Sequence, residues 1–308
     1  FYFTSKFIKY WKNNIAVFID SEIWPCIFKD LKKNSIPLLL MNARITPKSF
    51  TRWNFFNKFS KNIFHNIESA FPQNSETEKF LRRLKVKKIR KIGNLKFCET
   101  KSQKVTNLEK SFLKSIKKRL IFCASSTHPT EENAIALTHL ALKKKYKNLL
   151  TIIIPRHTDR VKEIYDELIS LNLKTIIRTS NKKILNNTDI YLVNTYGETK
   201  KFFNISKIVF IGGSIVNHGG QNPIEPARFG LNILHGPNVQ NFKDIYHLFN
   251  KSKIAHKFIN TKQLINISDK LLMSKKNKKL NLVKMGNLIL KRSVIEINKV
   301  LNYELKKT

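Results

Sequence analysis

The sequence predicts an α/β protein of two domains, each built on a parallel β-sheet that helices cover on both faces. Short apolar segments typical of buried strands alternate with helical segments along most of the chain, and short connections join them. The chain has 308 residues, which is more than one hydrophobic core usually organises. Hydrophobic residues make up 42% of it, enough for two ordinary cores, and this excludes a wholly disordered chain.

The first part of the chain predicts strands that are each followed by a helix or a turn. Thr46 suits the N-cap of a helix, and Pro25 and Pro47 suit the first turn of theirs. The predicted strands are 15–19, 36–42, 69–71 and 89–92, and the predicted helices are 25–33, one that opens at Thr46-Pro47, and 75–84.

A lysine-rich stretch over 99–118 predicts a connection between the domains together with a surface helix. The alternation then resumes, so we expect a first domain at 1–98 and a second at 119–308 that includes C-terminal helices. The predicted strands are 119–124, 149–155, 173–178, 190–194, 208–211 and 232–234, and the predicted helices are 130–145, 158–171, 222–229, 242–250 and two or three amphipathic helices within 261–307.

The composition is strongly basic, with 58 Lys and Arg against 21 Asp and Glu and a formal net charge of +37. Such a charge favours a polyanionic neighbour: nucleic acid, an acidic membrane surface or phosphorylated substrates. Abundant Lys beside Ile and Asn is also what an A+T-rich coding sequence produces, so the charge alone identifies no partner. Cys26, Cys98 and Cys123 lie far apart and predict no zinc site. No apolar run approaches the ~18 residues of a membrane span.

The strongest local signal is a glycine-rich segment between a predicted strand and a predicted helix. It contains Gly212-Gly213-Ser214, then Gly219 to Pro226. Asn222 fits an N-cap, Pro223 and Ile224 fit the first helical turn, and Glu225 follows in the same turn. A helix start after such a loop predicts an anion site, where a nucleotide or sugar phosphate fits. The alternative is that Glu225 only closes a capping box with Asn222.

Polar residues follow other predicted strands, where α/β sheets bind ligands. In Pro155-Arg156-His157 the guanidinium suits a phosphate, although it is equally a surface Arg of a basic protein. Asn194 to Glu198, which includes Tyr196 and Gly197, is by itself more typical of a simple turn. His128 either touches a ligand or caps the next helix, and His218 in the glycine-rich loop is equally ambiguous.

The first domain offers a second group of candidates. Asp20 to Pro25 places two carboxylates and Trp24 at a helix opening, and Gly93 to Lys96 lies near the predicted end of the domain. The two carboxylates suit either action on an acceptor or the positioning of a cation, and Lys96 suits the neutralisation of charge that develops on a leaving group. The alternatives are helix-start acids beside a core Trp24, and an ordinary surface Lys.

The ordered set of short motifs resembles the 3-deoxy-D-manno-octulosonic acid (Kdo) transferases of lipopolysaccharide synthesis over roughly residues 15–248. The motifs are DSEIWP at Asp20 to Pro25, NAR at Asn42 to Arg44, GNLKF at Gly93 to Phe97, STH at Ser126 to His128, PRH at Pro155 to His157, the glycine-rich block at Gly212 to Pro226, Gly236-Pro237 and Asn241-Phe242.

The resemblance implies an inverting glycosyltransferase of the GT-B fold, with two Rossmann-like domains facing a cleft and the N-terminal one incomplete here. It implies CMP-Kdo as donor in the C-terminal domain, and a phosphorylated lipid A precursor, lipid IVA, as acceptor in the N-terminal one. It implies no metal and no cofactor, and work at an anionic inner-membrane surface on the cytoplasmic face. Nucleic acid is not an expected partner.

The resemblance also carries residue roles. It implies transition-state support from Glu22 and Lys96. It implies donor contacts from the C-terminal residues Pro155, Arg156, Tyr196, Gly197, Glu198, Gly213, Ser214, Asn222, Pro223, Ile224 and Glu225.

The chain departs from the family pattern at its start. The family's general base is a Glu ahead of the first visible motif, and no such segment precedes Ile15, so we expect these 308 residues to lack turnover and the membrane anchor. Asp20 stands where the family often has Glu, and Asn194 where Asp is common. A different nucleotide-sugar enzyme of the GT-B fold, a basic nucleic-acid-binding protein and a non-catalytic remnant of the donor domain are the alternatives.

Overall fold

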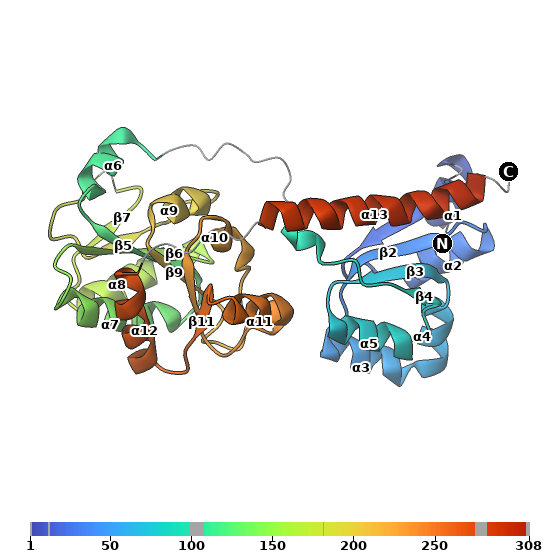
Figure 1. Cartoon of the computed structure of the whole chain (residues 1–308), viewed down its shortest axis with the longest axis horizontal. Helices are drawn as coiled ribbons and strands as arrows, with labels where there is room; N and C mark the ends of the chain where they lie inside the picture. Colours follow the sequence, from blue (N-terminus) through green and yellow to red (C-terminus); the bar gives the residue numbers. More distant parts are fainter. Residues whose placement is uncertain (1, 12, 99–107, 181, 275–281, 306–308) are drawn as a thin grey trace. The chain divides into compact units, whose positions relative to one another are not determined.

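The computed structural model describes residues 2–11, 13–98, 108–180, 182–274 and 282–305. It forms two compact units (Figure 1), one of Phe1–Lys101 with Asn281–Thr308 and one of Ser102–Leu280, here called unit 1 and unit 2. Most of the predicted connection, 99–107, lies outside the described residues. Its remainder contains the predicted surface helix, α6 (Lys110–Ile116), which belongs to unit 2.

Unit 1 contains a four-stranded parallel sheet in the order β1-β2-β3-β4. Every residue of β2 is buried. The predicted N-cap is confirmed, since Thr46 accepts a hydrogen bond from the Ser49 amide at 3.2 Å. The strands are β1 (Ala16–Ile19), β2 (Leu38–Ala43), β3 (Ile67–Pro72) and β4 (Lys88–Ile89), and the helices are α1 (Tyr2–Trp11), α2 (Pro25–Lys33), α3 (Pro47–Phe55), α4 (Asn57–Phe64), α5 (Ser75–Arg83), the short η1 (Leu95–Phe97) and α13 (Leu282–Leu305).

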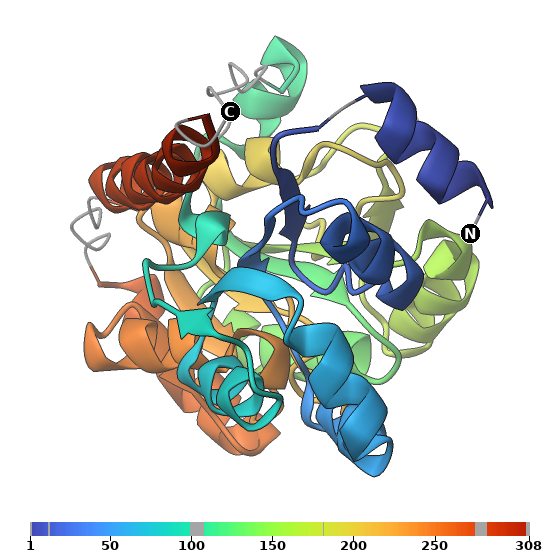
Figure 2. The same cartoon turned by 90° about the vertical axis from the view of Figure 1, so that its right-hand side faces the viewer.

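Helices cover both faces of this sheet (Figures 1 and 2). One face packs Leu38 and Leu40 with apolar residues of α1 to α5. The other face packs Leu39 and Met41 with Ile297 and Val300 of α13. Alternate residues of β2 therefore enter two different clusters, as the two-residue period of a strand requires.

The assignment of all C-terminal helices to the second domain is wrong for α13, which belongs to unit 1. Besides its apolar contacts, α13 is joined to this unit by an ion pair between Arg90 and Glu296 at 2.7 Å. The Cys98 thiol also donates to the Gly286 carbonyl at 3.1 Å. The sequence pattern of an amphipathic helix does not say which sheet its apolar side will cover.

Unit 2 contains a seven-stranded parallel sheet in the order β11-β10-β9-β5-β6-β8-β7. The sheet grows on both sides of β5, so the loops after β5 and β9 lie at a switch point of the strand order. The strands are β5 (Leu120–Thr127), β6 (Leu149–Pro155), β7 (Thr175–Ile177), β8 (Ile190–Leu192), β9 (Ile208–Ile211), β10 (Asn232–His235) and β11 (Ala255–Lys257).

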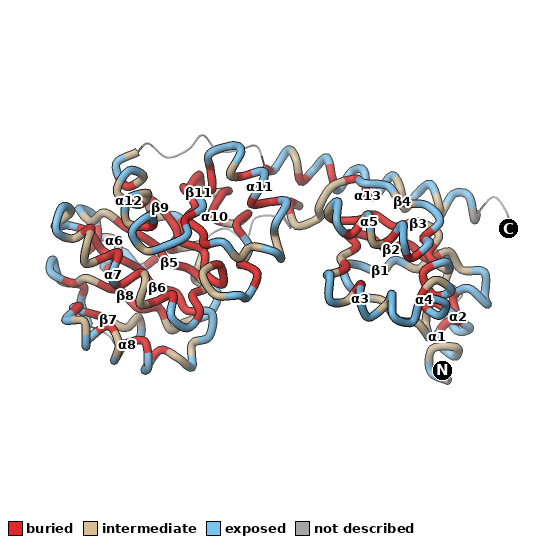
Figure 3. Tube along the Cα trace, turned by 90° about the horizontal axis from the view of Figure 1, so that it is seen from below, coloured by how far each residue is buried: buried red, intermediate tan, exposed pale blue. Residues whose placement is uncertain are grey.

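The strands of unit 2 are mostly buried (Figure 3), because helices lie on both faces of the sheet. Predicted α/β alternation is confirmed in both units, and the sequence missed α1, α4, α9 and β11. The helices of this unit are α6, α7 (Glu131–Lys143), η2 (Thr158–Arg160), α8 (Val161–Ser170), α9 (Thr199–Ile205), α10 (Ile224–Arg228), η3 (Gln240–Phe242), α11 (Lys243–Lys251) and α12 (Thr261–Leu272).

Candidate functional site

The loops that follow β5, β6 and β9 meet at the carboxyl edge of the unit 2 sheet. The Gly212 amide donates to the Ser125 carbonyl at 2.9 Å, and the Arg156 amide donates to the Thr127 carbonyl at 2.9 Å. Three segments that the sequence singled out, around Ser126, Arg156 and Gly212, are thereby brought together. Their proximity follows from the parallel pairing of β5 with both β6 and β9.

Glycine is required at two positions of the loop after β9. A Cβ atom on Gly212 would lie 2.1 Å from the Ser126 carbonyl oxygen, so no side chain fits there. Gly213 has φ +66°, a conformation that L-residues rarely adopt. The loop folds back on itself, since the Gly220 amide donates to the Gly213 carbonyl at 2.7 Å and the Gln221 amide to the Gly212 carbonyl at 3.1 Å.

The buried carboxylate of Glu131 organises this loop, and the sequence interpretation missed it. One oxygen accepts the amides of His128 and Gly213 at 3.0 and 2.8 Å. The other accepts those of Ser214 and Ile215 at 3.0 and 2.8 Å. Burial raises the pKa of Glu131, and the four amides act against that rise. The available signal was an acid opening the helix three residues after His128.

The loop is also tied to the next strand. Ser214, fully buried, donates to the Ile211 carbonyl at 2.6 Å and accepts the Gly236 amide at 3.0 Å. The Asn238 amide donates to the Ser214 carbonyl at 2.9 Å. The backbone of this loop is thus rigidly defined, which suits a site that must present its polar groups to a bound molecule.

Three histidines gather at this edge. The ring of His128 lies 4.3 Å from that of His218 and 6.3 Å from that of His157, centroid to centroid. His128 Nδ1 lies 3.0 Å from the Ser126 carbonyl, which accepts only from a protonated nitrogen. Its Nε2 is buried and has no partner within the part of the chain that the structure describes.

The environment of His128 favours the neutral ring. Burial lowers the pKa of His128, and the nearby charges of His218, His157 and Arg156 lower it further. A neutral ring protonated on Nδ1 leaves Nε2 as an acceptor, suited to a ligand hydroxyl. The capping alternative for His128 is wrong, because α7 has no side-chain cap at its N-terminus.

Arg156 is exposed, and it makes no ion pair with any described residue. It lies close enough to His128 to affect the pKa of that ring. An exposed guanidinium beside a glycine-rich loop retains its full capacity to bind a phosphate through two N–H groups.

Glu198 is held by cations rather than left free. Arg178 Nε and Nη2 each donate to its carboxylate at 3.1 Å, and Lys201 pairs with it at 3.0 Å. Thr195 donates to it as well. Burial alone would raise the pKa of Glu198, but these donors lower it to about 2. In the same turn Tyr196 is 75% exposed, and Gly197 has φ +80°.

The helix that follows the glycine-rich loop differs from the expectation. α10 begins at Ile224, its N-cap is Pro223, and it has no side-chain cap. Asn222 Oδ1 instead accepts the Ile224 amide at 3.0 Å, within the preceding turn. The capping-box alternative for Glu225 is therefore wrong. Its carboxylate lies 3.7 Å from Lys200 Nζ, so α9 and α10 are joined by a half-exposed ion pair.

A second polar group lies at the carboxyl edge of the unit 1 sheet, at the ends of β1 and β2. Asn42 donates to Asp20, and its Oδ1 accepts the Leu95 amide at 3.0 Å. Asp20 and Asn42 both have positive φ, at 61° and 49°. Burial lowers the pKa of Lys96, and the nearby positive charge of Arg44 adds to this effect. The negative charge of Asp20 acts in the opposite direction. The family motifs around Asp20, Asn42 and Lys96 thus meet in space.

Glu22 is exposed and accepts the Trp24 indole N–H at 2.8 Å. The alternative that placed Trp24 in the core is wrong, because this side chain is 54% exposed. An exposed Trp fixed by an exposed carboxylate is typical of a contact surface rather than of core packing. The sequence could not distinguish a core Trp24 from an exposed one, because the same large apolar side chain suits both environments.

The two groups belong to different units. Unit 2 brings together Arg156, His128, Gly213 and the residues that lead into Glu225, and unit 1 brings together Asp20, Asn42 and Lys96. Among the described residues no three His, Cys, Asp or Glu side chains gather as a metal site would require. None of the described helices is long and apolar enough to cross a membrane.

Two units with parallel sheets, each with polar groups at its carboxyl edge, are the components of the GT-B fold. The match to the sequence model of the family described as 3-Deoxy-D-manno-octulosonic-acid transferase (kdotransferase) covers residues 1–99. The N-terminal part of the chain therefore belongs to this domain family, and most of the chain is similar to curated 3-deoxy-D-manno-octulosonic acid transferases.

The relatives agree with this assignment. The chain is 36% identical to the 3-deoxy-D-manno-octulosonic acid transferase of Rickettsia felis over 79% of its own length and 52% of the relative. It is 35% identical to that of Rickettsia typhi over 88% of its own length and 58% of the relative. The chain therefore spans about half the length of these relatives.

Solved structures give the same picture. The C-terminal CMP-Kdo binding domain of WaaA from Acinetobacter baumannii is 26% identical, with a TM-score of 0.50 over 57% of this chain and 91% of that one. UDP-GlcNAc 2-epimerase from Neisseria meningitidis, bound to UDP-GlcNAc, is 14% identical, with a TM-score of 0.56 over 96% of this chain and 79% of that one. The second likeness shows the fold alone.

Proposed function

We propose that this protein takes part in the transfer of Kdo from CMP-Kdo to a phosphorylated lipid A precursor, lipid IVA, during lipopolysaccharide synthesis. The observation that carries the proposal is the loop Gly212–Ile215, held by Glu131 beside Arg156 and His128 at the edge of unit 2. The likeness of this chain to a CMP-Kdo binding domain supports CMP-Kdo as the donor.

In this proposal unit 2 holds the donor. Arg156 pairs with the cytidylate phosphate, and His128 Nε2 accepts a hydroxyl of the donor. The turns around Tyr196 to Glu198 and Asn222 to Glu225 line the nucleotide. The charges of Glu198 and Glu225 are each already paired with lysine, so they suit hydroxyl groups, which donate to a carboxylate, better than a second anion.

The proposed transfer is an inverting displacement without a cofactor or a metal. An acceptor hydroxyl attacks the anomeric carbon of Kdo, the bond from that carbon to the phosphate oxygen breaks, and CMP leaves with the electron pair. A general base takes the acceptor proton. Lys96 and Glu22 of unit 1 support the transition state, and the burial that lowers the pKa of Lys96 also strengthens its field on a nearby anion.

The proposed acceptor and location follow from family membership together with the charge. A net charge of +37 suits a phosphorylated acceptor and the anionic inner membrane at its cytoplasmic face. Those surfaces bind basic proteins through many weak contacts, so binding to anionic vesicles should weaken as salt rises.

Calorimetry on the whole chain tests the donor assignment. We expect CMP to bind more tightly than UMP or ADP, and Arg156→Ala to weaken CMP binding by about tenfold, as the loss of a charge-assisted hydrogen bond predicts. Lys147 is exposed and has no side-chain partner among the described residues. Lys147→Ala is therefore the matched control and should leave the affinity for CMP unchanged. A preference for UMP, or a folded chain that binds no nucleotide, would overturn the assignment.

A further inference from the structure

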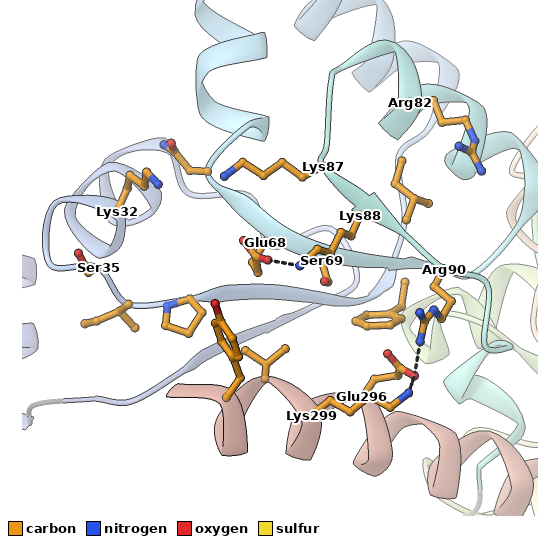
Figure 4. A pocket seen from close by; sticks show the side chains of 17 residues that line it. Lys32, Ser35, Glu68, Ser69, Arg82, Lys87, Lys88, Arg90, Glu296 and Lys299 are labelled. Carbon is orange, nitrogen blue, oxygen red and sulfur yellow. Dashed lines mark hydrogen bonds and ion pairs between the residues drawn. The ribbon is translucent and has the colours of Figure 1, made fainter. Parts of the chain in front are cut away.

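Unit 1 contains a basic pocket at the amino ends of its strands, at the edge opposite to Asp20 and Asn42. The pocket has a volume of about 1070 Å³. Most of its lining residues precede or begin β2, β3 and β4, and the last turns of α13 contribute as well (Figure 4). Phe71 near the end of β3, Arg82 of α5 and Arg90 just after β4 complete the lining. We call it the amino-edge pocket. No motif of the candidate site reaches it, so the inference below does not rest on the proposed function.

One side of the pocket gathers three lysines around a single carboxylate. Lys88 Nζ lies 2.7 Å from Glu68 Oε1. The hydrogen bond from Lys88 lowers the pKa of Glu68, and the charges of Lys87 and Lys32 lower it further. The side-chain amino groups of Lys32 and Lys87 have neither an ion pair nor a hydrogen bond to any residue that the structure describes. One carboxylate therefore leaves this side with excess positive charge.

The other side repeats the pattern on a different carboxylate. Arg90 Nη1 lies 2.7 Å from Glu296 Oε1, and Lys299 Nζ lies 2.9 Å from the same oxygen. The side chains of Arg90 and Lys299 are 62% and 58% exposed. Both cations can turn toward a bound anion while Glu296 remains between them, so this side also carries excess positive charge.

Apolar groups complete the lining. Ile36, Pro37, Phe71 and Val300 contribute to it, and Phe71 and Val300 belong to the cluster that packs α13 on the sheet. The pocket thus offers cations on two sides, which Figure 4 shows on the Glu68 side and the Glu296 side, together with an uncharged surface. A smaller hollow shares Arg82, Lys87 and Ile89 with it and extends the basic surface.

We propose that the amino-edge pocket binds a molecule that carries two phosphate groups on an uncharged body. Each phosphate would meet one of the two cation groups, with Arg90 able to offer two parallel N–H donors and the lysines acting as point charges. The body would lie on the apolar lining. A single phosphate would satisfy only one side, so the pocket favours two phosphates over one.

The chemistry is shared by soluble sugar bisphosphates and by the bisphosphate headgroup of cardiolipin, and the test separates them. Calorimetry on the whole chain would use fructose 1,6-bisphosphate against fructose 6-phosphate. Vesicle sedimentation would use cardiolipin against phosphatidylglycerol at equal phosphate. The variants are Lys32→Ala/Lys87→Ala for one side and Lys299→Ala for the other. Lys147→Ala/Lys270→Ala removes the same charge from exposed positions of unit 2.

We expect the double variant to weaken bisphosphate binding by about tenfold or more, since each lost contact is charge-assisted. Lys299→Ala should weaken it too, and the control should not. Binding of the sugar bisphosphate supports a soluble ligand, and variant-sensitive binding of cardiolipin vesicles alone supports the lipid. Equal binding of the mono- and bisphosphate, equal loss in the control, or no binding in either arm would overturn the proposal. Circular dichroism confirms that each variant is folded.

Discussion

The Glu131 carboxylate accepts the Gly213 amide at 2.8 Å, although the two residues are 82 positions apart in the sequence. Through this bond and the three to His128, Ser214 and Ile215, one buried side chain fixes the loops after β5 and β9 relative to each other. The backbone shape of the candidate donor site therefore depends on a residue that need not touch the donor itself.

Glu131→Ala should reduce the free energy of unfolding by at least about 3 kcal/mol, because four backbone amides lose their acceptor in a buried site. Glu131→Gln should cost less, since one oxygen can still accept. Urea denaturation measures both. Glu163→Ala, whose side chain is 67% exposed, should change stability by less than about 0.5 kcal/mol. Equal stability of Glu131→Ala and the wild type would contradict the assigned role.

Gly212→Ala should destabilise unit 2 by about 2 kcal/mol or more and weaken CMP binding in parallel, because the new Cβ would lie 2.1 Å from the Ser126 carbonyl oxygen. Gly197→Ala is the matched comparison. Its φ is +80° but its Cβ would meet nothing within 4 Å, so only the backbone strain of about 1 kcal/mol applies. Thermal unfolding and calorimetry together check the pair. A milder effect at Gly212 than at Gly197 would show that the loop can move aside.

Arg178→Met should lower stability by about 1–3 kcal/mol at neutral pH, because Glu198 and Glu109 lose their shared partner while the apolar length is kept. Glu198 has a pKa of about 2, below its ordinary value of 4.5. Its ion pairs therefore stabilise the fold above pH 4.5, and that contribution is lost as the pH falls toward 2. The difference between variant and wild type should shrink on acidification, and denaturation at pH 7 and pH 3 measures it. A difference that grows at pH 3 would exclude this ion-pair role.

Acidification below neutral pH should destabilise unit 2 through buried histidines. Burial lowers the pKa of His139 and His235 below 6.5, and both side chains are fully or almost fully buried. The unfolded chain then binds more protons than the folded one, so stability is present above pH 6.5 and is lost as the pH falls. Each histidine contributes up to about 1.4 kcal/mol per pH unit.

Urea midpoints at pH 7.5 and 5.5 test this expectation. His235→Asn should reduce the pH dependence, whatever its effect on stability at pH 7.5, because it removes one titrating ring. If the free energy of unfolding instead rose as the pH fell from 7.5 to 5.5, groups other than these histidines would control the pH dependence of stability in this range.

Local chemistry was readable from the sequence alone. Alternating apolar and helical segments determined the α/β class, because strand and helix periods are properties of short segments. The glycine-rich block was also recognisable from the sequence, because a positive φ such as that of Gly213 is a local backbone property that favours glycine. Thr46 capped its helix as expected, through a bond that spans three residues.

Only the tertiary structure decided which distant groups meet. It placed Glu131 under the glycine-rich loop, put α13 on the sheet of unit 1, exposed Trp24, and paired Glu225 with Lys200 instead of with Asn222. It also gathered Lys32, Lys87 and Arg90 around one pocket. Each of these depends on contacts between segments far apart in the chain. A hydrogen-bond acceptor, an apolar stripe or a charge has the same local pattern whichever partner it finally meets, so its partner is set by the packing of the whole unit.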